Sequence, residues 1–201
     1  FKVITRTGDL NRVLEGINAA IAQGINRIRL NVVVLDGLNR DEVLPLTHFA
    51  LAKNIHISFI EEMPLGQVNV GGKPLAYVSS DALHAELSEH FCLEPLSAEE
   101  TAGPSRDYLI SGSTTRVGFI SPHSNNFCAQ CNRLRISAEG RLLMCLGNEE
   151  SIDLRRLLRS GCNDDEIKRA IIDSLSIKPE RHTFDRPDEP QIVRFMNATG
   201  G

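Results

Sequence analysis

Apolar residues recur at helical spacing near the start of the chain and then gather in short continuous runs. One stripe predicts a helix that packs on a core and ends at Gly24; it consists of Leu10, Val13, Leu14, Ile17 and Ile21. Residues 28–35 (IRLNVVVL) and 56–60 (HISFI) are rich in branched and aromatic side chains, which predicts buried strands. A helix is expected between them, from about Asp41 to near Asn54. Residues 1–5 alternate weakly, and we expect a strand there.

Helices and strands that alternate in this way predict βα units around a parallel sheet, and therefore an α/β fold. Ligands of such sheets and barrels collect at the C-terminal ends of the strands. Residues 61–63 (EEM) follow the strand 56–60, so Met63 is expected at that end.

The pattern changes after Met63, where glycine and proline punctuate residues 64–74. We therefore divide the chain into residues 1–66, which carry the βα units, and residues 67–201. In the second part, residues 107–111 and 115–121 flank Gly112 and predict an antiparallel pair. Short helices are expected after Ser80, over residues 154–158 and after Asn163, followed by an irregular tail from Lys178.

Composition limits the classes of partner. The chain has 201 residues with 41% hydrophobic residues and a formal net charge of −4, which is typical of a globular protein and argues against bulk nucleic-acid binding. No apolar run approaches the roughly 20 residues of a membrane span, so we expect no membrane partner. Because no secretory segment is visible, we expect a cytoplasmic location or another reducing compartment. The chain begins with Phe1 rather than Met, so we expect a fragment of a longer protein.

Three of the five cysteines form the strongest chemical signal. Cys128 and Cys131 are two residues apart, and a hairpin with a turn at residues 137–140 (SAEG) would bring Cys145 back beside them. Iron, zinc and copper(I) accept such thiolates. A closed zinc site needs a fourth ligand, for which the candidates are Cys162, His123 and Cys92. On spacing alone we favour zinc over a [4Fe–4S] cluster with one open iron, and a non-catalytic zinc ribbon completed by Cys162 is the alternative function.

Arginines close to the cysteines suggest an anion. Arg133 and Arg135 are two positions apart, so in a strand they share a face on which two guanidinium groups suit phosphate oxygens. Arg29 and Asn31 are also two positions apart and share a face, and they interrupt a strand that is otherwise apolar. From the residues alone, a ligand contact for Arg29 and a pairing with a local partner are equally favoured.

The cysteines and arginines together resemble a known family. The motif C-x₂-C-N-R-L-R, with Cys145 thirteen intervening residues after Cys131, resembles the C-terminal cluster motif of the GTP 3′,8-cyclases. These are radical S-adenosylmethionine enzymes that open molybdenum cofactor (molybdopterin) biosynthesis. Residues 4–17 (ITRTGDLNRVLEGI), residues 59–66 (FIEEMPLG) and the terminal Gly200–Gly201 resemble the same family.

The resemblance implies a specific site and reverses the preference for zinc. It implies that Cys128, Cys131 and Cys145 hold a [4Fe–4S] cluster at which GTP binds. It also implies that Arg133, Leu134 and Arg135 contact GTP, together with Arg29 in place of the family's usual lysine. Met63 is expected beside S-adenosylmethionine, and Gly200 and Gly201 are expected to reach into the active site.

Two departures and several partners complete the expectation. Ser58 stands where the family has an arginine, and the C-x₃-C-x₂-C motif of the first cluster, which cleaves S-adenosylmethionine, is absent from the chain. We therefore expect the C-terminal portion of an incomplete TIM-like radical barrel followed by a small α+β cluster-binding region. The complete enzyme would be a lyase that converts GTP to (8S)-3′,8-cyclo-7,8-dihydroguanosine 5′-triphosphate, whereas this chain alone would be inactive. The resemblance further implies a homodimer and a downstream cyclic pyranopterin monophosphate synthase that acts on the product.

Overall fold

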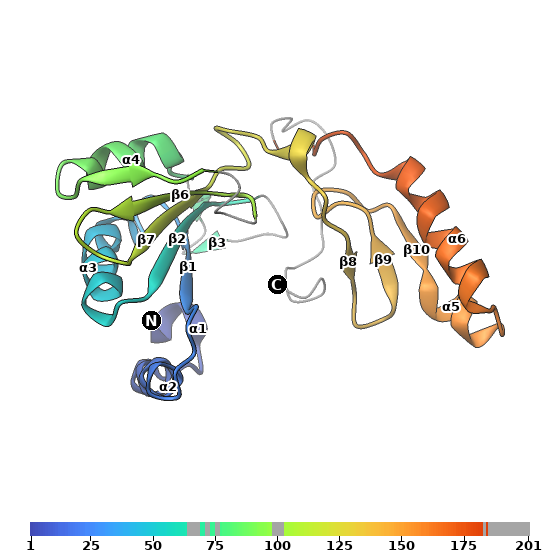
Figure 1. Ribbon diagram of the computed structural model, residues 1–201, viewed down its shortest axis with the longest axis horizontal. Coiled ribbons are helices and arrows are strands. Elements are labelled where there is room, and N and C mark those ends of the chain that lie inside the picture. The colour runs from blue at the N-terminus through green and yellow to red at the C-terminus, as the bar shows by residue number, and fades with distance from the viewer. Residues whose placement is uncertain (64–68, 71–72, 75–76, 98–102, 183, 185–201) are drawn as a thin grey trace.

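The chain folds into two lobes, each built from a sheet with helices on one face (Figure 1). A computed structural model describes residues 1–63, 69–70, 73–74, 77–97, 103–182 and 184. The N-terminal lobe holds a five-stranded sheet and the C-terminal lobe a three-stranded sheet. A further two-stranded pair, β3 (Asn69–Val70) and β4 (Lys73–Pro74), lies outside both sheets.

The larger sheet is mixed. Its strands lie in the order β1 (Arg29–Val34), β2 (His56–Glu61), β7 (Arg116–Ile120), β6 (Ser105–Ile110) and β5 (Leu93–Pro95). β1, β2 and β7 are parallel, whereas β6 is antiparallel to β7 and β5 is antiparallel to β6. This arrangement confirms the α/β class and the antiparallel pair expected around Gly112. β5 and β6 depart from the uniformly parallel order of a TIM barrel.

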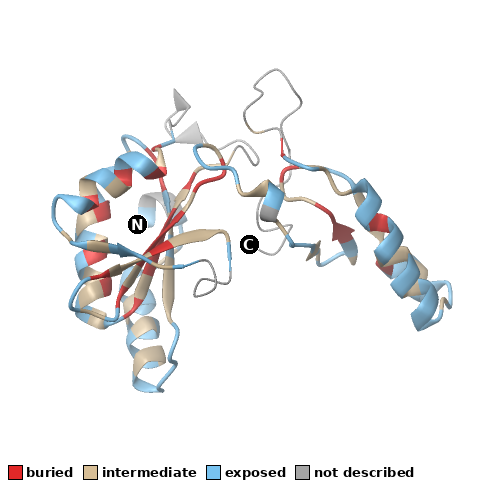
Figure 2. Cartoon of the chain, turned by 45° about the horizontal axis from the view of Figure 1, so that its top comes forward, coloured by how far each residue is buried: buried red, intermediate tan, exposed pale blue. Residues whose placement is uncertain are grey.

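Two helices cover one face of this sheet and enclose the main core. The short 3₁₀ helix η1 (Arg40–Glu42) leads into α3 (Val43–Lys53), which lies beside α4 (Ser80–Ser88) on that face (Figure 2). The largest side chains between them are at most 1% exposed; they are Ile57, Phe59, Leu83, Leu87, Val117 and Phe119. Each buried side chain of this size contributes about 2 kcal/mol, so this core dominates the stability of the lobe.

The first residues differ from the expectation. The strand predicted over residues 1–5 is wrong, because Lys2–Thr5 forms the one-turn helix α1. Its turn is closed by bonds from the Thr5 amide to the Phe1 carbonyl (3.0 Å) and from the Arg6 amide to the Lys2 carbonyl (2.8 Å). These local bonds satisfy the backbone without a partner strand.

Helix α2 (Leu10–Ala22) follows and confirms only half of the predicted stripe. Ile17 and Ile21 pack against the main core. Leu10 and Val13 are 47% and 46% exposed. The first two turns of the helix therefore present apolar side chains to the surface.

The C-terminal lobe contains the predicted hairpin. β8 (Arg135–Ile136) pairs antiparallel with β9 (Arg141–Leu143), and Gly140 takes the positive φ (79°) that the turn requires. A third strand, β10 (Ser151–Asp153), which was not predicted, pairs with the other side of β9.

Two helices cover this small sheet. α5 (Leu154–Arg159) and α6 (Asp164–Ser174) enclose a second core around Leu142 and Met144, and the 3₁₀ helix η3 (Leu175–Ile177) follows α6. Asn163 caps α6 through a capping box with Glu166, as expected.

One helix start lies one residue from its predicted position. Ser79, rather than Ser80, caps α4, because the extended Ser79 accepts a bond from the Ala82 amide. The Ser80 hydroxyl is instead buried, with no hydrogen-bond partner among the described residues.

The main sheet crosses the boundary that we expect at residues 66 and 67. β1 and β2 precede this boundary, whereas β5, β6 and β7 follow it. The N-terminal lobe therefore extends to Ile120, while a functional division at residue 66 stays a prediction. In the described part of the chain, no helix is both long enough and apolar enough to cross a membrane.

Candidate functional site

The loop between the two lobes carries the first pair of cysteines. Cys128 opens the 3₁₀ helix η2 (Cys128–Gln130), and the Cys131 amide donates to the Cys128 carbonyl (3.0 Å). Cys145 follows β9 and the fully buried Met144. All three thiols are half-buried.

The ionisation of Cys145 is influenced by burial and by the other two cysteines. Burial raises the pKa of Cys145, and the nearby Cys128 and Cys131 raise it further. A hydrogen bond from the Gly147 amide and the charge of Lys178 act in the opposite direction. The pairing of β8 with β9 confirms the predicted hairpin, whereas joint binding of a metal by the three thiols stays a prediction.

The described residues do not provide a site for a single metal ion. No three His, Cys, Asp or Glu side chains among them converge on one ion.

Of the candidates for a fourth ligand, Cys162 and Cys92 have their contacts in other parts of the chain, whereas His123 lines the same cavity as Cys128. Cys162 follows α5 in the C-terminal lobe, and its sulfur lies 3.5 Å from the Ser160 hydroxyl. Cys92 is exposed next to β5, and His123 Nε2 lies 2.7 Å from the Glu62 carbonyl. These positions do not favour the zinc-ribbon alternative.

Lys178 contacts the cysteine loop from the C-terminal side. Its ammonium donates to the carbonyls of Met144 (2.7 Å) and Arg133 (3.0 Å), and it lies 4.0 Å from the sulfur of Cys131. A cavity of about 680 Å³ lies between the cysteine loop and the residues that surround Lys178. Its lining includes Cys128, Lys178 and His182.

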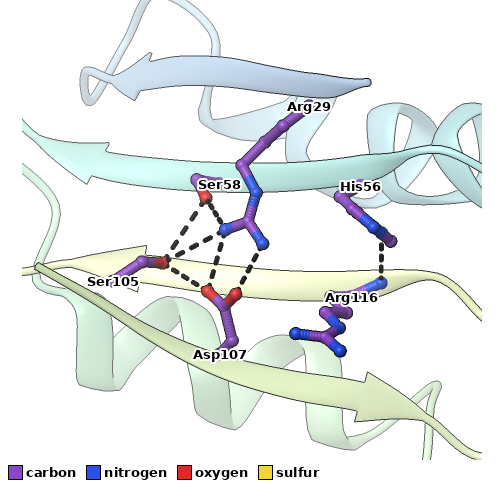
Figure 3. A network of polar contacts seen from close by, with 6 residues as sticks. All are labelled: Arg29, His56, Ser58, Ser105, Asp107 and Arg116. Carbon is purple, nitrogen blue, oxygen red and sulfur yellow. Dashed lines mark hydrogen bonds and ion pairs between the residues drawn. The ribbon is translucent and has the colours of Figure 1, made fainter. Parts of the chain in front are cut away.

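The second face of the main sheet is polar and carries a network of strand residues (Figure 3). Arg29 on β1 forms a two-pronged ion pair with Asp107 on β6, at 2.8 and 2.5 Å. It also donates to the Ser58 hydroxyl (2.7 Å). The Asp107 side chain is only 4% exposed. Burial acts to raise the pKa of Asp107, but the bonds from Arg29 and Ser105 lower it below its ordinary value.

Gly118 on β7 makes room for this network. A Cβ at this position would overlap the side-chain oxygens of Ser105 and Asp107 and would lie 2.7 Å from the Ser58 Oγ. β7 can therefore pass beneath Arg29 only because position 118 is a glycine, which has no side chain.

The network forms one wall of a cavity of about 580 Å³. Arg27, Arg29, Arg116 and Arg133 line it, opposed by the carboxylate of Asp107. Four cations against one anion give a positive cavity, which favours an anionic ligand. Arg133 comes from the cysteine loop, so this loop contributes one side chain to the cavity, which is otherwise lined largely by residues of the N-terminal lobe.

His56 adds an uncharged donor to the same cavity. Its Nδ1 accepts a bond from the Arg116 amide (3.2 Å), which places the proton of a neutral ring on Nε2. Burial lowers the pKa of His56, and the positive charges of Arg29 and Arg116 lower it further. The imidazole is therefore neutral at pH 7.

The C-terminal end of β2 is fastened by Glu61, which is 1% exposed. Its carboxylate accepts bonds from the amides of Ser80 (2.8 Å), His123 (2.9 Å) and Ser124 (3.0 Å), and from the Ser124 hydroxyl. It thus joins β2 to α4 and to the loop that leads to the cysteines. Met63 lies half-buried just beyond this junction, at the strand end where it was predicted.

The structure brings together some, but not all, of the predicted residues. Arg29 and Arg133 line one cavity, whereas Leu134 and Arg135 do not. Arg135 is half-buried in β8, so the two arginines are not both in a strand as expected. Gly200 and Gly201 lie outside the described residues.

The comparison with known proteins identifies the family. The chain belongs to the family described as Molybdenum Cofactor Synthesis C, whose model matches residues 55–184. Curated relatives named GTP 3′,8-cyclase match it along its whole length. They are 51% identical over 203 residues in Pseudomonas entomophila, 50% over 202 in Saccharophagus degradans and 52% over 203 in Pseudomonas putida strain W619.

The matched region is not the whole of these relatives. The alignments cover 100% of this chain but only 60% or 61% of each relative. The chain corresponds to their C-terminal part.

Sequence reasoning missed several residues of the site. Asp107 and Lys178 meet Arg29 and Arg133 across 78 and 45 positions of the chain. His56 and Arg116 are likewise 60 residues apart. The local spacing carries no signal for any of these contacts. For Arg29 the sequence left a ligand contact and a local partner equally open, and the partner in the structure is the distant Asp107.

Proposed function

We propose that this chain supplies the substrate-binding C-terminal portion of a GTP 3′,8-cyclase. One observation carries the proposal: Arg133, two residues after Cys131, lines the same positive cavity as Arg29 on the sheet. A nucleoside triphosphate in this cavity would therefore contact a residue that lies two positions after Cys131. The names of the relatives supply the identity of the nucleotide.

The donor set fits a [4Fe–4S] cluster. Cys128, Cys131 and Cys145 are half-buried soft ligands, two of them on the loop around η2 and one after β9, and a cavity lies beside Cys128. Three thiolates leave one iron of such a cluster open to coordinate a donor atom of the substrate. The protein's own part is to hold the thiolates and to restrict the access of water.

The positive cavity is suited to the triphosphate. Asp107 offsets the charge of Arg29, and Arg27 and Arg133 add positive charge to the cavity wall. We assign Arg29 a fixed position in the wall, where its remaining N–H groups are available to a ligand. Leu134 and Arg135 lie close to the loop in sequence, and we retain them as candidate GTP contacts.

The rest of the proposal concerns the complete protein. We propose that β1, β2 and β7 belong to a TIM-like barrel in which Met63 lies beside S-adenosylmethionine at the C-terminal strand ends. A separate cluster, absent from this chain, would start the radical reaction, so the 201-residue chain would bind GTP without converting it. A homodimer and a cyclic pyranopterin monophosphate synthase that uses the product are parts of the same proposal.

Anaerobic reconstitution with iron and sulfide tests the proposal. We expect about four irons and four sulfides per chain and a visible spectrum that changes on addition of GTP. One tightly bound zinc and no response to GTP would contradict the proposal and leave a structural module.

The Arg133→Ala substitution tests the cavity. We expect it to weaken GTP binding by about 10- to 100-fold, because it removes charge-assisted bonds to phosphate, while the iron content stays unchanged. Arg169→Ala, at an exposed position on α6, is the matched control and should leave the GTP affinity as it is. Equal affinities in the two variants would exclude Arg133 from the GTP site.

A further inference from the structure

The segment after η3, residues 178–182 together with Phe184, contacts the cysteine loop at several points. Lys178 makes the most direct contacts. An ammonium group has three protons, and Lys178 Nζ has three partners: the Met144 carbonyl (2.7 Å), the Arg133 carbonyl (3.0 Å) and the Cys131 sulfur (4.0 Å).

These partners lie on both sides of the hairpin. Arg133 comes two residues after Cys131, and Met144 comes immediately before Cys145. Since Lys178 binds main-chain oxygens on both arms, it fixes the distance between the backbone that carries Cys131 and the backbone that carries Cys145.

The same segment reaches the first cysteine through an asparagine. Asn126 Oδ1 accepts a bond from the Cys128 amide (2.7 Å), and Asn126 Nδ2 donates to His182 Nε2 (3.1 Å). His182 is only 8% exposed. A buried side chain thus orients the amide that holds the start of η2.

A third contact lies on the far side of Cys145. A Cβ on Gly147 would be 2.7 Å from His182 Cβ and 2.9 Å from the ring of Phe184. The rings of His182 and Phe184 are stacked, with centroids 4.2 Å apart. Gly147 therefore lets the segment lie directly against the backbone two residues after Cys145.

We propose that Lys178 and His182 are positioning residues for Cys128, Cys131 and Cys145. Lys178 holds the backbone next to Cys131 and Cys145, and His182 acts on Cys128 through Asn126. This inference rests on the proposed cluster. Every cysteine of the set has a contact with the segment, directly or through one neighbour. Groups that contact metal ligands without binding the metal themselves orient those ligands and tune metal affinity. A cation beside the thiolates also favours the reduced, more negative form of the cluster.

The test compares Lys178→Met with Lys168→Met in the full chain after anaerobic reconstitution. Lys168 is exposed on α6 and pairs with Asp165, so it is a matched lysine remote from the cysteines. For Lys178→Met we expect iron loss to a chelator that is about 10-fold faster than in wild type, together with a more negative midpoint potential. Lys168→Met should match wild type in both measurements.

Two further variants separate the charge from the packing. Lys178→Arg keeps the cation and should retain the wild-type potential, even if iron is lost faster. Gly147→Ala leaves the charge unchanged but displaces His182 and Phe184, so it should speed iron loss without shifting the potential. If Lys178→Met fails to fold, as judged by circular dichroism, Lys178→Arg and Gly147→Ala still test whether Lys178 and His182 position the cysteines.

The outcomes distinguish this inference from the proposed function. Iron in the wild-type chain supports the cluster, and the ratio between variant and control reports on the positioning role. Wild-type chain that holds iron while Lys178→Met, Lys178→Arg and Gly147→Ala all behave like Lys168→Met would overturn the positioning role alone. Wild-type chain without iron would overturn both.

Discussion

At the scale of single residues, two buried carboxylates hold the surroundings of the cavity in place. Asp107 fixes Arg29 across the sheet, and Glu61 fixes the loop that leads to the cysteines. Both have a pKa below the ordinary value, because the hydrogen bonds to each carboxylate outweigh the opposing effect of burial. Each therefore stabilises the fold in its ionised form.

The Asp107→Asn substitution should destabilise the protein strongly. It leaves the guanidinium of Arg29 in a partly buried site without its counter-ion, which costs about 3 kcal/mol. Urea denaturation at neutral pH measures this loss. Asp81→Asn is the control, because its ion pair with Arg106 has a 72% exposed carboxylate and should cost less than about 1 kcal/mol. Equal losses in the two variants would contradict a structural role for the Asp107 pair.

The Glu61→Gln substitution should lower stability in a pH-dependent way. The new amide turns donors toward backbone N–H groups, so we expect a loss of about 2 kcal/mol at pH 7. Because the pKa of Glu61 is lowered in the fold, its contribution is full above the ordinary value of 4.5 and declines as the pH falls below it. Denaturation curves from pH 7 to pH 3 should show a constant difference between wild type and variant down to about pH 4.5 and a shrinking difference below it.

Glu62→Gln provides the contrast for this prediction. Burial raises the pKa of Glu62, so its ionised form is disfavoured in the fold and neutralisation at pH 7 should cost nothing. A pH-independent loss in Glu61→Gln, or the same loss in Glu62→Gln, would disprove the assignment.

At the scale of elements, the same substitution should have opposite effects in a strand and in a helix. Gly118→Ala places a methyl group inside the Arg29 network of β7 and should cost about 2 kcal/mol or more. Gly16→Ala in α2 meets nothing within 4 Å and should add about 0.5–1 kcal/mol through helix propensity. Thermal unfolding of both variants checks the prediction, and a shift in the same direction for both would refute it.

Elements with a strong period were predictable from the sequence. β1, β2, α3 and the β6–β7 pair follow from their apolar runs and turn residues, and the hairpin of β8 and β9 follows from its glycine turn. β5 and β10 have only three residues each, too few to display a period. They form because a partner strand is already present, which is tertiary information.

The site was predictable only where its residues are close in sequence. The three cysteines and Arg133 stand within a single stretch, so their spacing was enough. Asp107, Lys178 and His182 reach the site from distant segments, and no local pattern marks them. The tail from Lys178, expected to be irregular, contains contacts that only the fold could reveal.

At the scale of the whole molecule, one edge of the main sheet carries apolar surface. β1 pairs with β2 on one side, and no strand among the described residues pairs with its other side. Val33 is 43% exposed there, and Leu10 and Val13 of α2 are also exposed. Such an edge favours association with other chains.

The Val33→Lys substitution should therefore reduce self-association without loss of stability. Charged side chains at an edge oppose strand pairing, so light scattering of the purified chain should fall while the melting temperature stays the same. Val32→Lys is the control on the opposite face, where the side chain packs against the core and the substitution should unfold the lobe. Unchanged scattering in Val33→Lys would show that this edge does not drive association.

The way Lys178 holds the cysteine loop also affects how the protein can diverge. Its hydrogen bonds go to the main-chain oxygens of Arg133 and Met144, which are present whatever side chains those positions carry. Arg133, which lines the cavity, and Met144, which lies in the small core, can thus be exchanged during evolution without loss of these two hydrogen bonds. Substrate preference can drift at position 133 while the geometry of the thiols is inherited unchanged.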